Sequence, residues 1–269
     1  MKSLPALLAV LGVWAGFAAV AHAQAAPNDA GLANWAVVVV AGDDRSAHDD
    51  TPTETFDNAR RDVVAALTRR GFNAANIAQF SVNPDRYPAD HAGKAGLGVV
   101  FTTLEALADK ATAGCLVYIT SHGSPEGVVM NDRLVPPKVL ASMTGRACGV
   151  RPTAVILSAC FSGVFVPALK APERLVLTAA RRDRSSFGCG EADRYPFFDA
   201  CVIQALPTAQ DFVELGDRAR RCVADREDKE GMRPRSEPQL WVGPTFKSVA
   251  PAFAGPAAAQ PDGKTPDRR

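Results

Sequence analysis

One histidine and one cysteine each follow a short apolar run and carry reactive side chains. His122 comes just after the run 116–120 and is followed by Gly123, and Cys160 comes just after the run 154–158. A cysteine nucleophile needs a base nearby, because the thiolate reacts and free cysteine is mostly protonated at neutral pH. The pair therefore predicts nucleophilic catalysis. The N–H groups of Gly123 and Cys160 are candidates for an oxyanion hole.

Each residue taken alone also has an ordinary structural interpretation. A cysteine after an apolar strand is usually a small buried hydrophobe, and a histidine beside glycine is usually a turn residue. Beyond residue 23 the chain contains His48 in an acidic loop, His91 in a loop rich in Gly and Pro, and His122. The placement of His122 and Cys160 after two successive strands favours the catalytic interpretation.

The elements that must position this pair alternate along the chain. Strands are expected at 36–41, 77–82, 116–120, 154–158 and 175–178, and helices at 56–70, 99–113, 136–143, 195–206 and 208–226. This alternation indicates βαβ units and a mostly parallel sheet with helices on both faces. In open α/β sheets, reactive groups gather beyond the carboxyl ends of the strands. Adjacent strands would bring His122 and Cys160 side by side.

The first residues of the chain predict export. Lys2 precedes an apolar run over 4–20, and Ala21-His22-Ala23 forms a small-x-small cleavage site, as in secretory signal peptides. A membrane anchor is the alternative, but the run is marginal for a bilayer, which needs about 20 apolar residues. The mature protein is expected to be periplasmic or secreted, without stable membrane insertion.

The rest of the chain predicts one large domain. We expect a signal peptide over 1–23, a linker over 24–34, the domain over 35–250 and a disordered tail over 251–269, which is rich in Pro, Ala, Gly and charge. The formal net charge of +1 falls to zero without Lys2. A near-neutral chain without a basic stripe argues against a nucleic-acid partner. No His and Cys spacing forms a zinc site, so no metal or cofactor is expected.

The ordered motifs of the chain resemble those of the legumain-like branch of the caspase-fold cysteine peptidases, family C13, in a short bacterial form. The resemblance extends over roughly 35–243 and rests on 37–44 (VVVVAGDD), 121–124 (SHGS), 158–163 (SACFSG), 177–189 (LTAARRDRSSFGC) and 236–239 (SEPQ). It implies an α/β, caspase-like three-layer sandwich with a mostly parallel sheet. It also implies an endopeptidase that cleaves protein or peptide substrates through a thioester.

The resemblance assigns roles residue by residue. His122 would be the catalytic histidine and Cys160 the nucleophile. Legumains orient the histidine with an asparagine, and Asp44 takes that position here. A carboxylate can accept from an imidazole N–H. The alternative is that Asp43 and Asp44 form a solvated loop.

The specificity pocket implied by the resemblance departs from the family pattern. Ser185 and Ser186 match, and so does Asp199 if 195–200 aligns with the helix that lines the pocket. Phe161 replaces the acidic residue that follows the legumain nucleophile, and no arginine matches the family's pocket cation. Asparagine preference therefore does not transfer.

A carboxylate without a cation predicts a preference for Lys or Arg before the scissile bond, because a buried charge is costly unless it is paired. Arg60 or Arg61, reaching in from the first helix, would restore the missing cation. Phe161 covering Asp199 would instead leave the site apolar.

The other cysteines are Cys115, Cys148, Cys189, Cys201 and Cys222. An oxidising compartment favours disulfides, and at most two form if Cys160 stays free. Proximity in sequence favours Cys189 with Cys201 or Cys222, and buried free thiols are the alternative.

Two functions of other classes are compatible with these residues. A transamidase would pass the same acyl group to an amine rather than to water. A catalytically silent binding domain would keep the fold without the chemistry. The oligomeric state is left open.

Overall fold

The structure, a computed structural model, describes residues 31–47, 49–190 and 193–253. The expected signal peptide lies outside the described residues, as do 24–30 of the linker and 254–269 of the tail. Of the helices that are described, none is long and apolar enough to cross a membrane.

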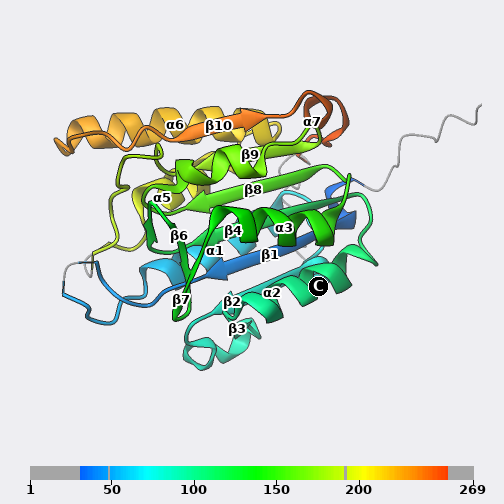
Figure 1. Cartoon of the computed structure of the whole chain (residues 1–269), viewed down its shortest axis with the longest axis horizontal. Helices are drawn as coiled ribbons and strands as arrows, with labels where there is room; N and C mark the ends of the chain where they lie inside the picture. Colours follow the sequence, from blue (N-terminus) through cyan, green and yellow to red (C-terminus); the bar gives the residue numbers. More distant parts are fainter. Residues whose placement is uncertain (1–30, 48, 191–192, 254–269) are drawn as a thin grey trace, which may run out of the picture.

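A seven-stranded sheet forms the middle layer, in the order β10-β9-β8-β4-β1-β2-β3 (Figure 1). Its strands are β1 (Trp35–Ala41), β2 (Ile77–Ser81), β3 (Gly93–Lys94), β4 (Gly114–Thr120), β8 (Thr153–Ser158), β9 (Arg174–Thr178) and β10 (Gln239–Val242). All neighbours pair in parallel except β9 and β10, which are antiparallel. Every residue of β1, β4 and β8 is buried, as expected for apolar strands covered on both faces.

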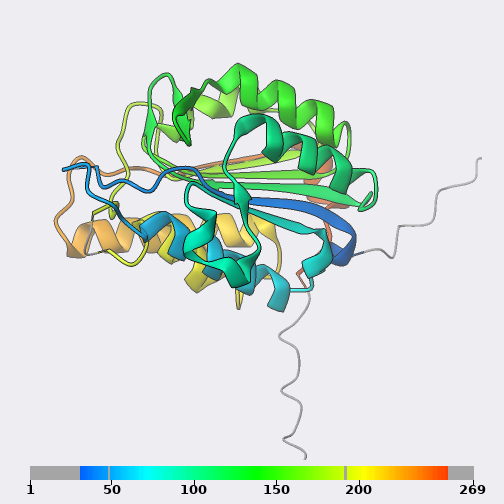
Figure 2. The same cartoon turned by 90° about the horizontal axis from the view of Figure 1, so that it is seen from below.

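Helices cover both faces of this sheet (Figure 2). One layer contains α1 (Thr55–Arg69), α5 (Phe197–Ala205) and α6 (Phe212–Lys229), and the other contains α2 (Leu97–Ala108), α3 (Pro137–Cys148) and α4 (Val166–Leu169). The side chains of β1 alternate between two cores: Val37 and Val39 pack with the first layer, and Val38 and Val40 with the second. The expected three-layer α/β sandwich is therefore confirmed.

Shorter elements complete the described chain. They are α7 (Pro244–Val249) and the 3-10 helices η1 (Leu32–Asn34), η2 (Ala74–Asn76), η3 (Pro84–Arg86), η4 (Pro88–Asp90) and η5 (Ser162–Phe165). A second sheet contains β5 (Gly123–Ser124), β6 (Gly127–Met130) and β7 (Arg133–Val135), in that order. The sequence pattern predicted neither this sheet nor β10.

Several helix ends differ from the expectation; the helix expected over 208–226, for example, is Phe212–Lys229. The helix expected over 99–113 ends at Ala108, because the chain then extends toward β4 and the Ala113 N–H donates to Asn34 O at 3.0 Å. The helix expected over 136–143 continues to Cys148. It stops at Gly149, whose φ of 58° suits a glycine and ends the helix.

Candidate active site

The parallel pairing of β4 with β8 places His122 and Cys160 at the same distance beyond the ends of these two strands. Thr120 and Ser158 are partners in this pairing, and the Ser121 N–H donates to Ser158 O at 3.0 Å. His122 lies two residues beyond Thr120, and Cys160 lies two residues beyond Ser158. Because neighbouring strands lie about 4.8 Å apart, equal offsets bring the imidazole and the thiol to the same part of the sheet edge.

Gly123 marks the closest approach of the two motifs. A Cβ at this position would lie 2.4 Å from Cys160 O, a distance that no side chain tolerates. In the β5–β6 hairpin the Val129 N–H donates to His122 O at 2.9 Å, and Gly123 faces Val128. Hydrogen-bonded and non-hydrogen-bonded pairs alternate in an antiparallel ladder. The Gly123 N–H therefore points away from the hairpin partner.

The sulfur of Cys160 contacts Ser186. The Ser186 N–H donates to Sγ at 3.2 Å, and the Ser186 hydroxyl oxygen lies 3.5 Å from Sγ. The sulfur also lies 3.6 Å from the main-chain oxygen of Ser186, to which the thiol donates. Ser185 is exposed. Of the two serines, Ser186 is the one that the structure places against the Cys160 sulfur.

The imidazole of His122 has a main-chain hydrogen-bond acceptor and an aromatic neighbour. Its Nε2 donates to Arg45 O at 2.8 Å, since a carbonyl oxygen only accepts. The ring of Phe56 meets it edge to face, with centroids 5.0 Å apart and planes at 85°. A neutral ring protonated at Nε2 has Nδ1 as its basic nitrogen.

Asp44 does not hold the imidazole, so this expectation is wrong. Its carboxylate instead accepts from the amide of Asn83. The next residue, Arg45, takes the orienting position through a main-chain atom, which no residue type in the sequence could indicate.

Asp43 lies closer to the site than Asp44. Its Oδ1 accepts from the N–H groups of Asp44 at 2.8 Å and Arg45 at 3.1 Å. Burial raises the pKa of the Asp43 carboxyl, and attraction to His122 opposes this rise. Asp43 is therefore part of the site and not a solvated loop residue.

Asp199 on α5 lies in the core, with 0% of its surface exposed. The Tyr118 hydroxyl donates to Oδ1, and the hydroxyls of Thr120 and Ser158 donate to Oδ2 at 2.8 Å and 2.6 Å. Burial raises the pKa of Asp199 to about 6, although these hydrogen bonds lower it. Because the three hydroxyls occupy the carboxylate, the geometry does not support the expected contact with a basic substrate side chain.

The hydroxyl donors were a signal that the sequence interpretation missed. Tyr118, Thr120 and Ser158 interrupt otherwise apolar strands. Tyr118 and Thr120 are two residues apart and so share a face of the sheet. Polar residues on one face of a buried strand need a partner on the facing helix, and here that partner is Asp199.

The first helix supplies no cation to Asp199. Arg60 has 0% of its side chain exposed and pairs with Asp57 at 2.8 Å and Asp90 at 2.9 Å. Arg61 also pairs with Asp90, at 2.9 Å. Neither arginine forms the zwitterionic pocket that the sequence left open.

An open cleft of about 720 Å³ contains His122, Gly123 and Cys160. Its other walls are the loop after β1 and Phe161. Phe161 has a φ of 57°, in the left-handed region that non-glycine residues rarely adopt. Its N–H donates to Arg184 O at 2.8 Å, which fixes the turn directly after the nucleophile.

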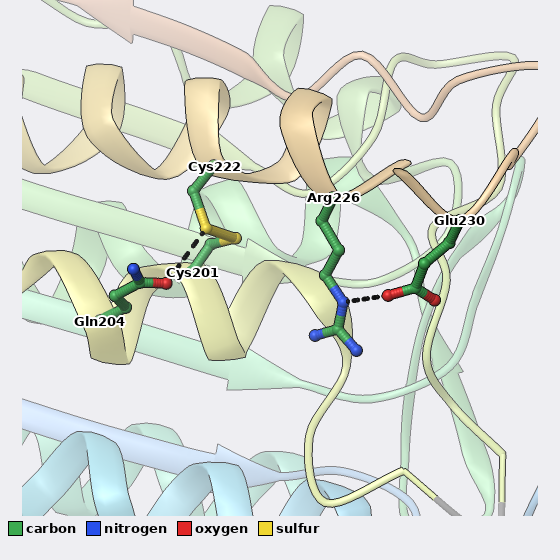
Figure 3. The surroundings of a disulfide bond; sticks show 5 residues. All are labelled: Cys201, Gln204, Cys222, Arg226 and Glu230. Atoms are coloured by element: carbon green, nitrogen blue, oxygen red, sulfur yellow. Dashed lines mark hydrogen bonds and ion pairs between the residues drawn. A yellow bond between two sulfur atoms is a disulfide. The ribbon is translucent and has the colours of Figure 1, made fainter. Parts of the chain in front are cut away.

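The cysteine pairing differs from the expectation. The disulfides are Cys115–Cys148 and Cys201–Cys222, and Figure 3 shows the second one joining two helices. Pairing of Cys189 with Cys201 or Cys222 is therefore wrong, because the packing of α5 against α6 brings those two cysteines together. The free cysteines of the described chain are Cys160 and Cys189.

Cys189 is a partly buried thiol close to the site. Burial raises its pKa well above the ordinary range, and the nearby Cys160 and Asp199 add to the rise. Over 31–47, 49–190 and 193–253, no group of three or more His, Cys, Asp or Glu side chains could hold a metal ion.

Comparison with known proteins identifies the family. The sequence model of the Peptidase C13 family matches residues 12–236. Among solved structures, the fold is similar to caspase-1 from Spodoptera frugiperda, with a TM-score of 0.59 and 14% identity over 87% of this chain and 96% of that chain. The structure of pro-sf-caspase-1 gives a TM-score of 0.57 and 14% identity over 82% of this chain and 96% of that chain. No curated protein matches.

The two kinds of similarity support different conclusions. At 14% identity the solved structures establish the fold alone, which is caspase-like. The family match covers most of the chain and includes both His122 and Cys160. It confirms the resemblance drawn from the motifs: the chain belongs to the Peptidase C13 family of cysteine peptidases.

Proposed function

We propose that the protein is an exported cysteine endopeptidase in which Cys160 is the nucleophile and His122 is the general acid and base. The observation that carries the proposal is the equal offset of the two residues beyond the paired ends of β4 and β8. His122 and Cys160 both line the open cleft at this edge, and this cleft is the proposed binding site of the peptide substrate.

In the first half of the reaction, Nδ1 of His122 takes the proton of the Cys160 thiol and the sulfur attacks the scissile carbonyl carbon. The carbonyl oxygen becomes an oxyanion. The N–H groups of Gly123 and Cys160 are its donors: the first lies outside the hairpin ladder, and the second donates to no other main-chain group of the described chain. The imidazolium then gives its proton to the leaving amine, and a thioester remains.

In the second half, a water molecule replaces the amine. The imidazole takes a proton from this water, the resulting hydroxide attacks the thioester, and the acid product leaves as the sulfur regains its proton. The hydrogen bond from Nε2 to Arg45 O keeps the orientation of the ring in both halves and selects the Nε2-protonated tautomer whenever the ring is neutral.

The test is the substitution Cys160→Ala, measured with a mixed peptide library and a folded-state control by circular dichroism. Removing the nucleophile is expected to lower kcat by at least about 1,000-fold while the fold is retained. Activity within tenfold of the parent would end the assignment. Repeating the parent reaction with an added amine and analysing the products distinguishes hydrolysis from acyl transfer to the amine.

Export is the second part of the proposal. It is supported by the apolar run and small-residue site over 4–23 and by two disulfides, since these persist in oxidising compartments. N-terminal sequencing of protein from the periplasm or medium is expected to begin at Gln24. Intact protein starting at Met1 in the membrane fraction would contradict this part.

A further inference from the structure

The loop after β1 contains a turn that is held by one side chain. Asp43 Oδ1 accepts from the N–H groups of the next two residues, Asp44 at 2.8 Å and Arg45 at 3.1 Å. The second of these bonds is the one that defines an Asx turn. Since both donors belong to the main chain, the carboxylate fixes the backbone of Asp44 and Arg45.

The same loop is held from the other side as well. The Thr53 N–H donates to Asp44 O at 2.8 Å, the Ser46 N–H donates to Thr51 O at 2.8 Å, and Arg45 forms a bridge with Pro52. The peptide between Asp44 and Arg45 is thereby clamped between the returning chain and the Asp43 carboxylate.

The Arg45 carbonyl belongs to the peptide that directly follows this turn, whose Ser46 N–H donates to Thr51 O, and it is the acceptor of the proposed catalytic imidazole. Arg45 O lies 2.8 Å from His122 Nε2. The edge-to-face packing of Phe56 against the ring restricts tilting but selects no tautomer. The protonated nitrogen, and with it the basic one, is therefore chosen by Arg45 O.

The Asp44 carboxylate accepts from the amide of Asn83 rather than from the main chain that carries the Arg45 carbonyl. Asp43, in contrast, lines the cleft together with His122. The two adjacent aspartates thus have separate tasks.

We propose that Asp43 is the positioning residue of the active site, which acts on His122 through the Arg45 main-chain carbonyl rather than by direct contact. The inference rests on the proposed catalytic role of His122. In this arrangement a main-chain atom, rather than a carboxylate or amide side chain, orients the imidazole. The Asp43 carboxylate holds the turn, and the Arg45 carbonyl that follows the turn accepts from the imidazole.

Three substitutions separate this role from others. Asp43→Asn keeps an oxygen that accepts from both N–H groups and removes only the charge, whereas Asp43→Ala removes the acceptor. Asp44→Ala is the matched control, because it removes the neighbouring carboxylate with its bond to Asn83. All are compared with Cys160→Ala and His122→Ala in one peptidase assay, with thermal unfolding as the check of folding.

For Asp43→Ala we expect kcat to fall by about 100-fold, the usual cost of misplacing a catalytic group by about 1 Å, with KM within about threefold of the parent. Asp43→Asn and Asp44→Ala are expected to stay within about fivefold of the parent.

Equal losses in Asp43→Asn and Asp43→Ala would overturn the proposal in favour of a charge effect. Equal losses in Asp43→Ala and Asp44→Ala, or full activity of Asp43→Ala, would overturn it as well. If Cys160→Ala and His122→Ala are inactive in the same assay, such a result removes this inference alone. If those two variants are active, the proposed function itself fails.

Discussion

Asp199 connects the interior of the protein with the residues beside the catalytic pair. Two of its hydroxyl donors, Thr120 and Ser158, stand two residues before His122 and Cys160 and share the oxygen Oδ2. The carboxyl group thereby ties α5 to the ends of β4 and β8. These hydrogen bonds hold the strand ends that precede His122 and Cys160.

We expect Asp199→Asn to remove a pH dependence of stability. Because the folded-state pKa is raised to about 6 from 3.8, the folded protein keeps a proton over this window that the unfolded chain has released. The parent's free energy of unfolding therefore falls as pH rises through the window and stays low above it. The expected loss is up to roughly 3 kcal/mol.

Urea unfolding of parent and variant at about pH 4 and about pH 7.5 measures this effect. Between the lower and the higher pH, the unfolding free energy of the parent is expected to fall by more than that of the variant. A difference that stays constant would show that Asp199 does not carry the shifted titration.

At the scale of elements, the active site is a product of strand register. The pairing of Thr120 with Ser158 fixes the offset of the two proposed catalytic residues, and the approach of Gly123 to Cys160 O fixes the gap between their motifs. In Figure 1 the arrowheads of β1 and β8 point to the same edge of the sheet. The loop after β1 therefore reaches the pair.

Gly123→Ala tests the close approach. The added methyl group would lie 2.4 Å from Cys160 O, so the two motifs must separate and kcat is expected to fall by at least about 100-fold. Gly98→Ala is the control, because nothing lies within 4 Å of a Cβ at that position of α2. It is expected to keep full activity and to raise helix stability by up to about 1 kcal/mol. Full activity of Gly123→Ala would show that the gap is not constrained.

Elements with a strong local signal were predictable from the sequence. The runs that form β1, β4 and β8 are mostly apolar, so burial on both faces follows from the residue types alone. The β5–β7 sheet could not be predicted, because strands of two to four residues depend on their pairing rather than on a pattern. The site was predictable to the same extent. His122 and Cys160 could be recognised by their residue types, whereas Arg45 could not, because it contacts His122 through its main-chain oxygen.

At the scale of the whole molecule, one disulfide lies on each face of the sheet. Cys115 of β4 is joined to Cys148 at the end of α3 on one face, and Cys201–Cys222 joins α5 to α6 on the other. Pairing across separate elements explains why sequence proximity misassigned Cys189. The free thiols of the described chain are left near the cleft.

We expect denatured, unreduced protein to take up two equivalents of iodoacetamide, on Cys160 and Cys189, and six after reduction, because the chain has six cysteines. Loss of each disulfide is expected to lower the free energy of unfolding by about 2–4 kcal/mol. Mass spectrometry of labelled peptides and urea unfolding with and without reductant measure both effects. A disulfide-linked peptide that contains Cys189 would contradict the pairing.

The central place of β4 and β8 has a consequence for how the protein loses activity on heating. Amide protons of fully buried central strands exchange only through the largest openings of a protein, so His122 and Cys160 stay level until the whole sheet opens. The Arg45 carbonyl lies on a connecting loop, and loops open at lower free energy. We therefore expect heat to disturb the imidazole before it separates the pair. Peptidase activity is expected to fall ahead of the unfolding transition and to return on cooling without any refolding of the core.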